Sequence, residues 1–127
     1  MEHHDITEKI IGCSMKVHSL LEPGFVELVY QNALAFELRK AGLTVECEKQ
    51  LTVFYEEEMV GGFCCDMVIC DVVLVENKAL RALTPAHEAQ LVNYLTATGF
   101  DVGLLLNFGA PSLEFKRKTR SFRRRTT

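Results

Sequence analysis

The sequence lacks the cysteine pattern of a disulfide framework or of a zinc site. Its five cysteines are an odd number, lie in apolar segments and include no Cys-x-x-Cys pair. Cys64 and Cys65 are neighbours in a segment typical of a β-strand, so their side chains should point to opposite faces and not form a ligand pair. We therefore expect reduced thiols that pack as small apolar side chains.

Long apolar runs are also missing. Runs such as Val72–Val75 are far too short to cross a bilayer, and the N-terminus has neither the basic start nor the apolar stretch of a signal peptide. We expect a soluble, cytoplasmic protein with no membrane partner. A chain of 127 residues, 48% hydrophobic and 24% charged, is large enough for one core and too small for two.

Acidic residues are absent from residues 116–127, which hold seven of the 14 basic residues and carry a net charge of +7. Residues 1–115 carry the other seven together with all 17 acidic residues, a net −10. A basic block of this kind can follow a phosphate backbone, although it could equally be a solubilising end. We expect one domain over residues 1–118 and a basic C-terminal tail over 119–127.

Apolar residues at helical spacing predict two helices, over roughly residues 5–21 and 25–41, with turn signals at Glu22–Gly24 and Gly42. After Gly42 the period changes. Alternation and β-forming residues predict strands at 44–48 and 51–55, or one long bent strand. The segment from Glu56 to Gly62, with its two adjacent glycines, is predicted as a turn region.

Residues 63–70 and 72–78 form two further apolar β-type runs, and the tight connection near Asp71 predicts an antiparallel hairpin. Thr84-Pro85 is a helix-start signal for a third helix that ends near Gly99. Residues 102–108 are typical of a central strand covered on both faces, and residues 113–118 could add an edge strand. The order α-α-β-β-β-α-β indicates an α/β fold.

Three charged residues interrupt these apolar strands. Glu76 and Lys78 project from one face at the end of their strand, and Asp66 lies where both burial and β-propensity disfavour an aspartate. Pairing Ile69 with Val73 would place Asp66 opposite Glu76, whereas a two-residue loop would place it opposite Val75. Two facing carboxylates repel unless a proton or a cation lies between them, and such oxygen ligands suit Mg²⁺ or Mn²⁺.

Asp66 followed by Glu76-Asn77-Lys78 resembles the Asp…(Asp/Glu)-x-Lys signature of the PD-(D/E)XK nuclease superfamily. Residues 24–30 match the GxxExxY motif that names a family within it, and Gln90 leading to Tyr94 is similar to the Gln-x-x-x-Tyr helix of its RecB-type branch. The resemblance covers roughly residues 6–118. It implies a restriction-endonuclease-like αβββαβ core, a mixed central sheet flanked by helices.

The resemblance also implies roles for single residues. Asp66, Glu76 and the backbone carbonyl of Asn77 would bind one Mg²⁺ or Mn²⁺, and Lys78 would orient the attacking water or offset charge in the transition state. Four more residues would assist: Glu27 in the metal's outer shell, Tyr30 by fixing that carboxylate or contacting substrate, and Gln90 with Tyr94 by contacting phosphate or bracing the lysine.

Each of these residues also has a structural interpretation. Glu76 and Lys78 could form a strand-end salt bridge, Gln90 and Tyr94 could cap buried strands, and Glu27 could be an acid favoured by a helix N-terminus. The resulting hypothesis is a metal-dependent nuclease acting on DNA or RNA. The alternatives are a weak or inactive nuclease-fold module for nucleic-acid binding or assembly, and a scaffold that forms a homodimer through the edge strand at 113–118.

Overall fold

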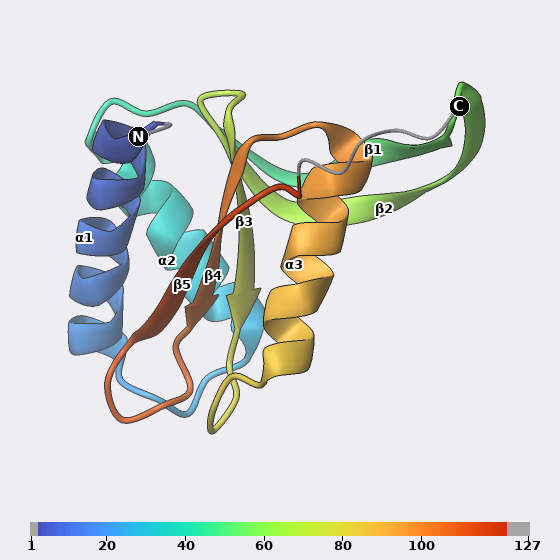
Figure 1. Ribbon diagram of the computed structural model, residues 1–127. Helices are drawn as coiled ribbons and strands as arrows, with labels where there is room; N and C mark the ends of the chain where they lie inside the picture. Colours follow the sequence, from blue (N-terminus) through green and yellow to red (C-terminus); the bar gives the residue numbers. More distant parts are fainter. Residues whose placement is uncertain (1–2, 122–127) are drawn as a thin grey trace.

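The structure, a computed structural model, describes residues 3–121 and confirms the predicted α/β fold (Figure 1). One mixed sheet has the strand order β1-β2-β3-β4-β5, and helices cover both of its faces. The elements are α1 (His4–Leu21), α2 (Glu27–Lys40), β1 (Val45–Tyr55), β2 (Glu58–Ile69), β3 (Val73–Lys78), α3 (Pro85–Thr98), β4 (Val102–Asn107) and β5 (Glu114–Thr119). Most of the basic tail, including Arg123, Arg124 and Arg125, lies outside the described residues.

The two faces of the sheet bury two separate apolar clusters. On one face α1 and α2 pack against alternate residues of β3 and β4, among them Val73, Val75 and Leu104. On the other face α3 packs against the residues between them, including Leu74 and Leu105. Because both faces are covered, β3 and β4 are apolar along almost their whole length, as the sequence predicted. In the described residues, no helix is long and apolar enough to span a bilayer.

β3 and β4 run parallel, with Leu74 the partner of Gly103, and α3 forms the crossover between them. The remaining pairs of neighbouring strands are antiparallel. The predicted edge strand exists as β5, which pairs with β4 and leaves its other side at the edge of the sheet. The carboxyl ends of β3 and β4 therefore lie side by side, as sites in α/β folds commonly require.

β1 and β2 form a long ribbon that extends beyond the body of the domain (Figure 1). The prediction of a turn region over residues 56–62 is wrong, because the turn comprises only Glu56 and Glu57 and the two glycines lie within β2. A Cβ on Gly62 would come within 2.8 Å of the Leu51 carbonyl oxygen. The close approach of β1, and not a turn, explains this glycine.

The ribbon changes its orientation to the sheet part of the way along. In β1, Cys47 packs with the α1–α2 cluster and Leu51 packs with the α3 cluster. In a regular strand these two side chains, four residues apart, would lie on the same face. β2 shows the same change between Met67 and Cys65. The change falls at Glu48, whose φ of 52° lies in the left-handed region. The outer half of the ribbon is thereby brought beside α3.

Gly103 marks a close contact between α3 and the sheet. An added Cβ would lie 3.1 Å from the Leu74 carbonyl oxygen and 3.1 Å from the side chains of Leu91 and Leu95. We expect Gly103→Ala to lower the free energy of unfolding by about 1–3 kcal/mol through overpacking, as measured by urea denaturation.

Gly12, inside α1, offers the matched control because an added Cβ there meets nothing within 4 Å. Gly12→Ala should raise the free energy of unfolding, by up to about 1 kcal/mol, since alanine favours the helix more than glycine does. Equal stability of Gly103→Ala and wild type would show that α3 packs less closely on β4 than the structure indicates.

Candidate active site

The hairpin of β2 and β3 has the register that brings Asp66 and Glu76 together. Ile69 pairs with Val73 and Met67 pairs with Val75, which is the first of the two registers that the sequence allowed. The pairing of β2 with β3 ends at Met67 and Val75. The next residue on each strand, Asp66 in β2 and Glu76 in β3, faces the other, but the two are not paired in the sheet.

Both carboxylates accept a backbone hydrogen bond from the opposite strand. The Asp66 N–H donates to Glu76 Oε2 at 3.0 Å, and the Asn77 N–H donates to Asp66 Oδ2 at 2.7 Å. Where β2 leaves β3, side-chain oxygens thus replace carbonyl oxygens as partners of the two N–H groups. This reciprocal pair fixes one oxygen of each carboxylate in the gap between the strands.

Burial makes the charged form of both carboxylates unfavourable. Glu76 is only 9% exposed, and burial raises its pKa to about 7. The nearby Asp66 charge raises this pKa further, whereas the hydrogen bond from the Asp66 N–H and the Lys78 charge lower it. Burial also raises the pKa of Asp66, against the Asn77 N–H and the Lys78 charge. Two ionised carboxylates are therefore unfavourable here, and a proton or a cation would relieve their repulsion.

The Lys78 charge favours the ionised form of both carboxylates, so the structure brings the three signature residues together at the end of β3. Glu27, the first residue of α2, is close enough for its charge to raise the pKa of Glu76 further. The sheet and α2 therefore present three carboxylates and one ammonium to the same region.

α3 borders the other side of this region. The ring of Tyr94 stacks on Phe63 of the ribbon with centroids 4.1 Å apart. Its hydroxyl pKa is raised, first by burial and then by the charges of Glu76 and Asp66, while the Gln90 side chain acts in the opposite direction. Tyr94 thus lies near the two carboxylates, and the Gln90 side chain lies beside Tyr94 on α3. Their predicted contacts with phosphate or with Lys78 stay predictions.

The arrangement suits an oxygen-binding divalent cation. In the described part of the chain, Asp66 Oδ1 and Glu76 Oε1 have no hydrogen bond. The Asn77 carbonyl should lie on the β2 side of its strand, because the N–H of the same residue points there. Within residues 3–121 no three His, Cys, Asp or Glu side chains are grouped to bind a metal, so a cation here would use two carboxylates, this carbonyl and water.

Tyr30 has a structural position instead of the predicted contact with Glu27 or substrate. The side chain is fully buried; its hydroxyl donates to the Glu22 carbonyl at 2.6 Å and accepts the Phe25 N–H at 3.1 Å. These bonds close the loop around Gly24, whose φ of 131° disfavours other residues, and so fix the start of α2. Tyr30 thus fixes the loop that leads into α2, whose first residue is Glu27.

Two residues near the site were not predicted. Phe63 was assigned only to a strand, and its stacking on Tyr94 depends on the change in ribbon orientation. Asn107 ends the apolar run of β4 and is fully buried. A polar residue that ends a buried strand is the same signal that pointed to Glu76 and Lys78, and it could have identified Asn107 as well.

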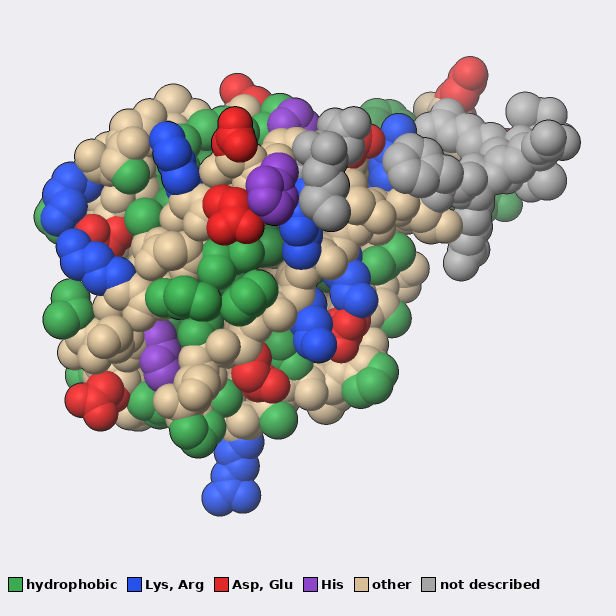
Figure 2. Space-filling model, turned by 60° about the vertical axis from the view of Figure 1, so that its left-hand side comes forward, with side chains coloured by type: hydrophobic (Ala, Val, Ile, Leu, Met, Phe, Trp, Pro, Cys, Tyr) green, Lys and Arg blue, Asp and Glu red, His purple; other side chains and the backbone are tan. Residues whose placement is uncertain are grey.

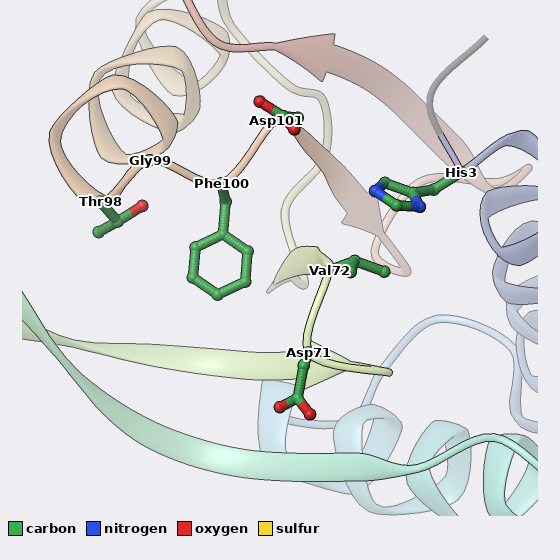
Figure 3. Close-up of a pocket in the computed structure, with 7 residues that line it drawn as sticks. All are labelled: His3, Asp71, Val72, Thr98, Gly99, Phe100 and Asp101. Carbon is green, nitrogen blue, oxygen red and sulfur yellow. The ribbon is translucent and has the colours of Figure 1, made fainter.

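A separate cavity of about 210 Å³ lies at the opposite end of β3 (Figure 3). The ring of Phe100 and the imidazole of His3 lie on opposite sides of it, and Val72 lies between them. Asp101, which also borders the cavity, forms an ion pair with Arg120 at 2.9 Å. This cavity is distinct from the carboxylate site, because Val72 precedes β3 and Lys78 ends it.

The fold and the site lead to one family. Residues 4–118 match the PD-(D/E)XK nuclease superfamily, and the chain belongs to it. Among solved structures it is similar to an alkaline exonuclease, LHK-Exo from Laribacter hongkongensis, with a TM-score of 0.53 and 12% identity over 95% of this chain and 72% of that one.

Two further structures are less similar. LHK-Exo in complex with dAMP gives a TM-score of 0.49 and 12% identity over 91% of this chain and 83% of that one. The structure of SSO0001 gives a TM-score of 0.47 and 14% identity over 93% of this chain and 79% of that one. No curated protein matches the chain. At these identities the likeness to LHK-Exo shows a shared fold and leaves the activity to be argued from the site.

The raised pKa of Glu76 predicts a pH-dependent stability of the metal-free protein. A carboxyl whose pKa rises from 4.5 to about 7 on folding contributes stability below pH 4.5 that is lost as the pH rises through 7. The free energy of unfolding should therefore fall across this window, by at most about 3 kcal/mol from this residue. In Glu76→Gln the fall should be smaller, as measured by urea denaturation at several pH values with a chelator present.

Glu57→Gln in the exposed ribbon turn is the matched control and should keep the wild-type pH profile. If Glu76→Gln and wild type showed the same profile, the Glu76 carboxyl would not be strained by burial, and the electrostatic description of the site would be wrong.

Proposed function

We propose that this protein is a divalent-metal-dependent nuclease that hydrolyses phosphodiester bonds of DNA or RNA at Asp66, Glu76 and Lys78. The observation that carries the proposal is the pair of facing, partly buried carboxylates, each with one oxygen fixed by a backbone N–H and one left for a ligand. Membership of the superfamily supports it. We further propose that the chain belongs to the GxxExxY group and to the RecB-type branch.

Asp66, Glu76 and the Asn77 carbonyl would bind Mg²⁺ or Mn²⁺. When bound, such an ion polarises a phosphate oxygen and lowers the pKa of a coordinated water. The carboxylates meet the requirement for this role, because their reciprocal hydrogen bonds set their spacing before any ligand arrives. Their mutual repulsion also favours a cation over an empty site.

Lys78 would offset the negative charge that accumulates on the phosphoryl oxygens in the transition state, or orient the attacking water. Gln90 and Tyr94 border the same region from α3 and would contact the substrate phosphate or brace the lysine. Glu27 would accept a hydrogen bond from a water bound to the ion, because its position at the start of α2 places its charge near Glu76.

A second candidate function is a nuclease-fold module that binds nucleic acid or a protein partner without efficient chemistry. The surface charges favour the protein-binding form of this module: Lys118 pairs with Glu88 at 2.6 Å, and Arg120 pairs with Asp101. On the face drawn in Figure 2, basic side chains are mixed with acidic ones and do not form one large basic area. This face thus offers phosphate little long-range attraction. A homodimer through the β5 edge stays a prediction.

The direct test is cleavage of labelled single-stranded, duplex and flap substrates with Mg²⁺ or Mn²⁺. Lys78→Met should lower the single-turnover rate by about 100-fold, because it removes charge from the transition state, while leaving Mn²⁺ binding intact. Glu76→Gln should abolish single-turnover cleavage. It should also weaken Mn²⁺ binding by more than about 10-fold, because a ligand itself is changed.

Lys9→Met, on an exposed part of α1, is the matched control for the loss of one lysine charge and should cleave as wild type does. Full activity of Glu76→Gln would place any chemistry elsewhere. Binding of nucleic acid by the wild type without cleavage of any substrate would favour the second function.

A further inference from the structure

A buried amide adjoins the end of β3. Asn107, the last residue of β4, is fully buried and is the partner of Lys78 in the parallel pair. Its Oδ1 accepts the N–H groups of Leu80 at 2.8 Å and Gly109 at 3.1 Å. Its Nδ2 donates to the Leu80 carbonyl at 3.0 Å and to Glu114 Oε1 at 2.7 Å.

These four bonds use the whole hydrogen-bonding capacity of the side chain, since an asparagine offers two lone pairs on oxygen and two N–H donors. The bonds also fix the orientation of the amide, because two partners donate and two accept. An aspartate of the same size would lack both donors, leaving the Leu80 carbonyl without this partner and facing Glu114 with a second carboxylate. Only an amide satisfies the site.

The same network binds both ends of the segment between β3 and α3, residues 79–84. Near its start, Asn107 binds both backbone groups of Leu80. Near its end, the Leu83 N–H donates to Glu114 Oε1 at 3.1 Å, the oxygen that Asn107 also contacts. A Cβ on Gly109 would lie 2.4 Å from the Leu80 nitrogen, so the two backbones are in direct contact.

This segment joins the two elements that carry the proposed site, with Lys78 before it and Gln90 and Tyr94 on the helix after it. In the described part of the chain the Lys78 ammonium has no hydrogen bond or ion pair. The backbone from which its side chain extends is held at the carbonyl, which accepts the Phe108 N–H at 2.9 Å. The backbone in turn is held next to the Asn107 network.

We propose that Asn107 is a positioning residue, which through Leu80 holds Lys78 and the start of α3 in the geometry required for phosphodiester cleavage. The inference rests on the proposed nuclease function. Asn107 contacts neither of the two carboxylates and is not a ligand for the cation. It acts through the backbone on the lysine that does touch the substrate.

The test compares Asn107→Asp with wild type. We expect kcat to fall by about 100-fold, because a displacement of a reacting group by about 1 Å has that effect, with the Mn²⁺ dissociation constant unchanged. The chemical shift of the Leu80 amide should change by NMR, because aspartate still accepts the Leu80 N–H but no longer donates to the Leu80 carbonyl. Asn32→Asp, an exposed position on α2, makes the same chemical change and should leave kcat at its wild-type value.

Gly109→Ala is the second variant, in case Asn107→Asp does not fold. It pushes on Leu80 without changing the amide, and it should lower kcat in the same way with unchanged Mn²⁺ binding. A variant whose kcat equals that of wild type despite a shifted Leu80 amide resonance would overturn the proposal. So would a parallel loss of kcat, Mn²⁺ binding and melting temperature, which would give Asn107 a role in folding alone.

If the wild type cleaves no substrate, the proposed function fails, and the positioning role is then decided by NMR. The Lys78 ε-methylene and Leu80 amide shifts should both change in Asn107→Asp and stay the same in Asn32→Asp. Unchanged Lys78 and Leu80 shifts in Asn107→Asp would overturn the role of Asn107 independently of any activity.

Discussion

The site depends on one constraint: two backbone N–H groups need acceptors where β2 parts from β3. The carboxylates of Asp66 and Glu76 supply them, each reaching to the opposite strand. In a regular continuation of the hairpin, the Asn77 N–H would bond to a carbonyl oxygen of β2, and the Asp66 carboxylate would have no such role in the gap. The parting of the strands and the change in ribbon orientation at Glu48 belong to one local geometry.

The rest of the molecule supports this site. β3 and β4 are buried on both faces, so their carboxyl ends are rigid and present Glu76, Lys78 and Asn107 side by side. α3 is held against β4 at Gly103, and its Tyr94 ring stacks on Phe63 of the ribbon. The polar groups therefore lie on the ends of well-packed elements, which is what accurate placement of charged groups requires.

Much of this could be predicted from the sequence, because apolar periodicity reports directly on burial. The three helices, the central strand and the edge strand were predicted, and Asp66 and Glu76 were placed on neighbouring strands. Their register was left open because it depends on Cys70 and Asp71, whose φ values of 53° and 60° are left-handed although neither residue is glycine. Gly62 was misread because glycine serves both tight turns and close strand contacts. The motif that contains Tyr30 identified an important residue without showing where its hydroxyl goes.

The central claim is that Asp66 and Glu76 form a site for a divalent cation. Its most direct test is a crystal structure of the protein soaked in Mn²⁺, with anomalous diffraction data collected at the manganese edge. We predict one strong anomalous peak between the two carboxylates, within coordination distance of Asp66 Oδ1, Glu76 Oε1 and the Asn77 carbonyl, with the hydrogen bonds at Oδ2 and Oε2 retained. Carboxylates that keep their positions with no anomalous density between them at saturating Mn²⁺ would contradict the claim.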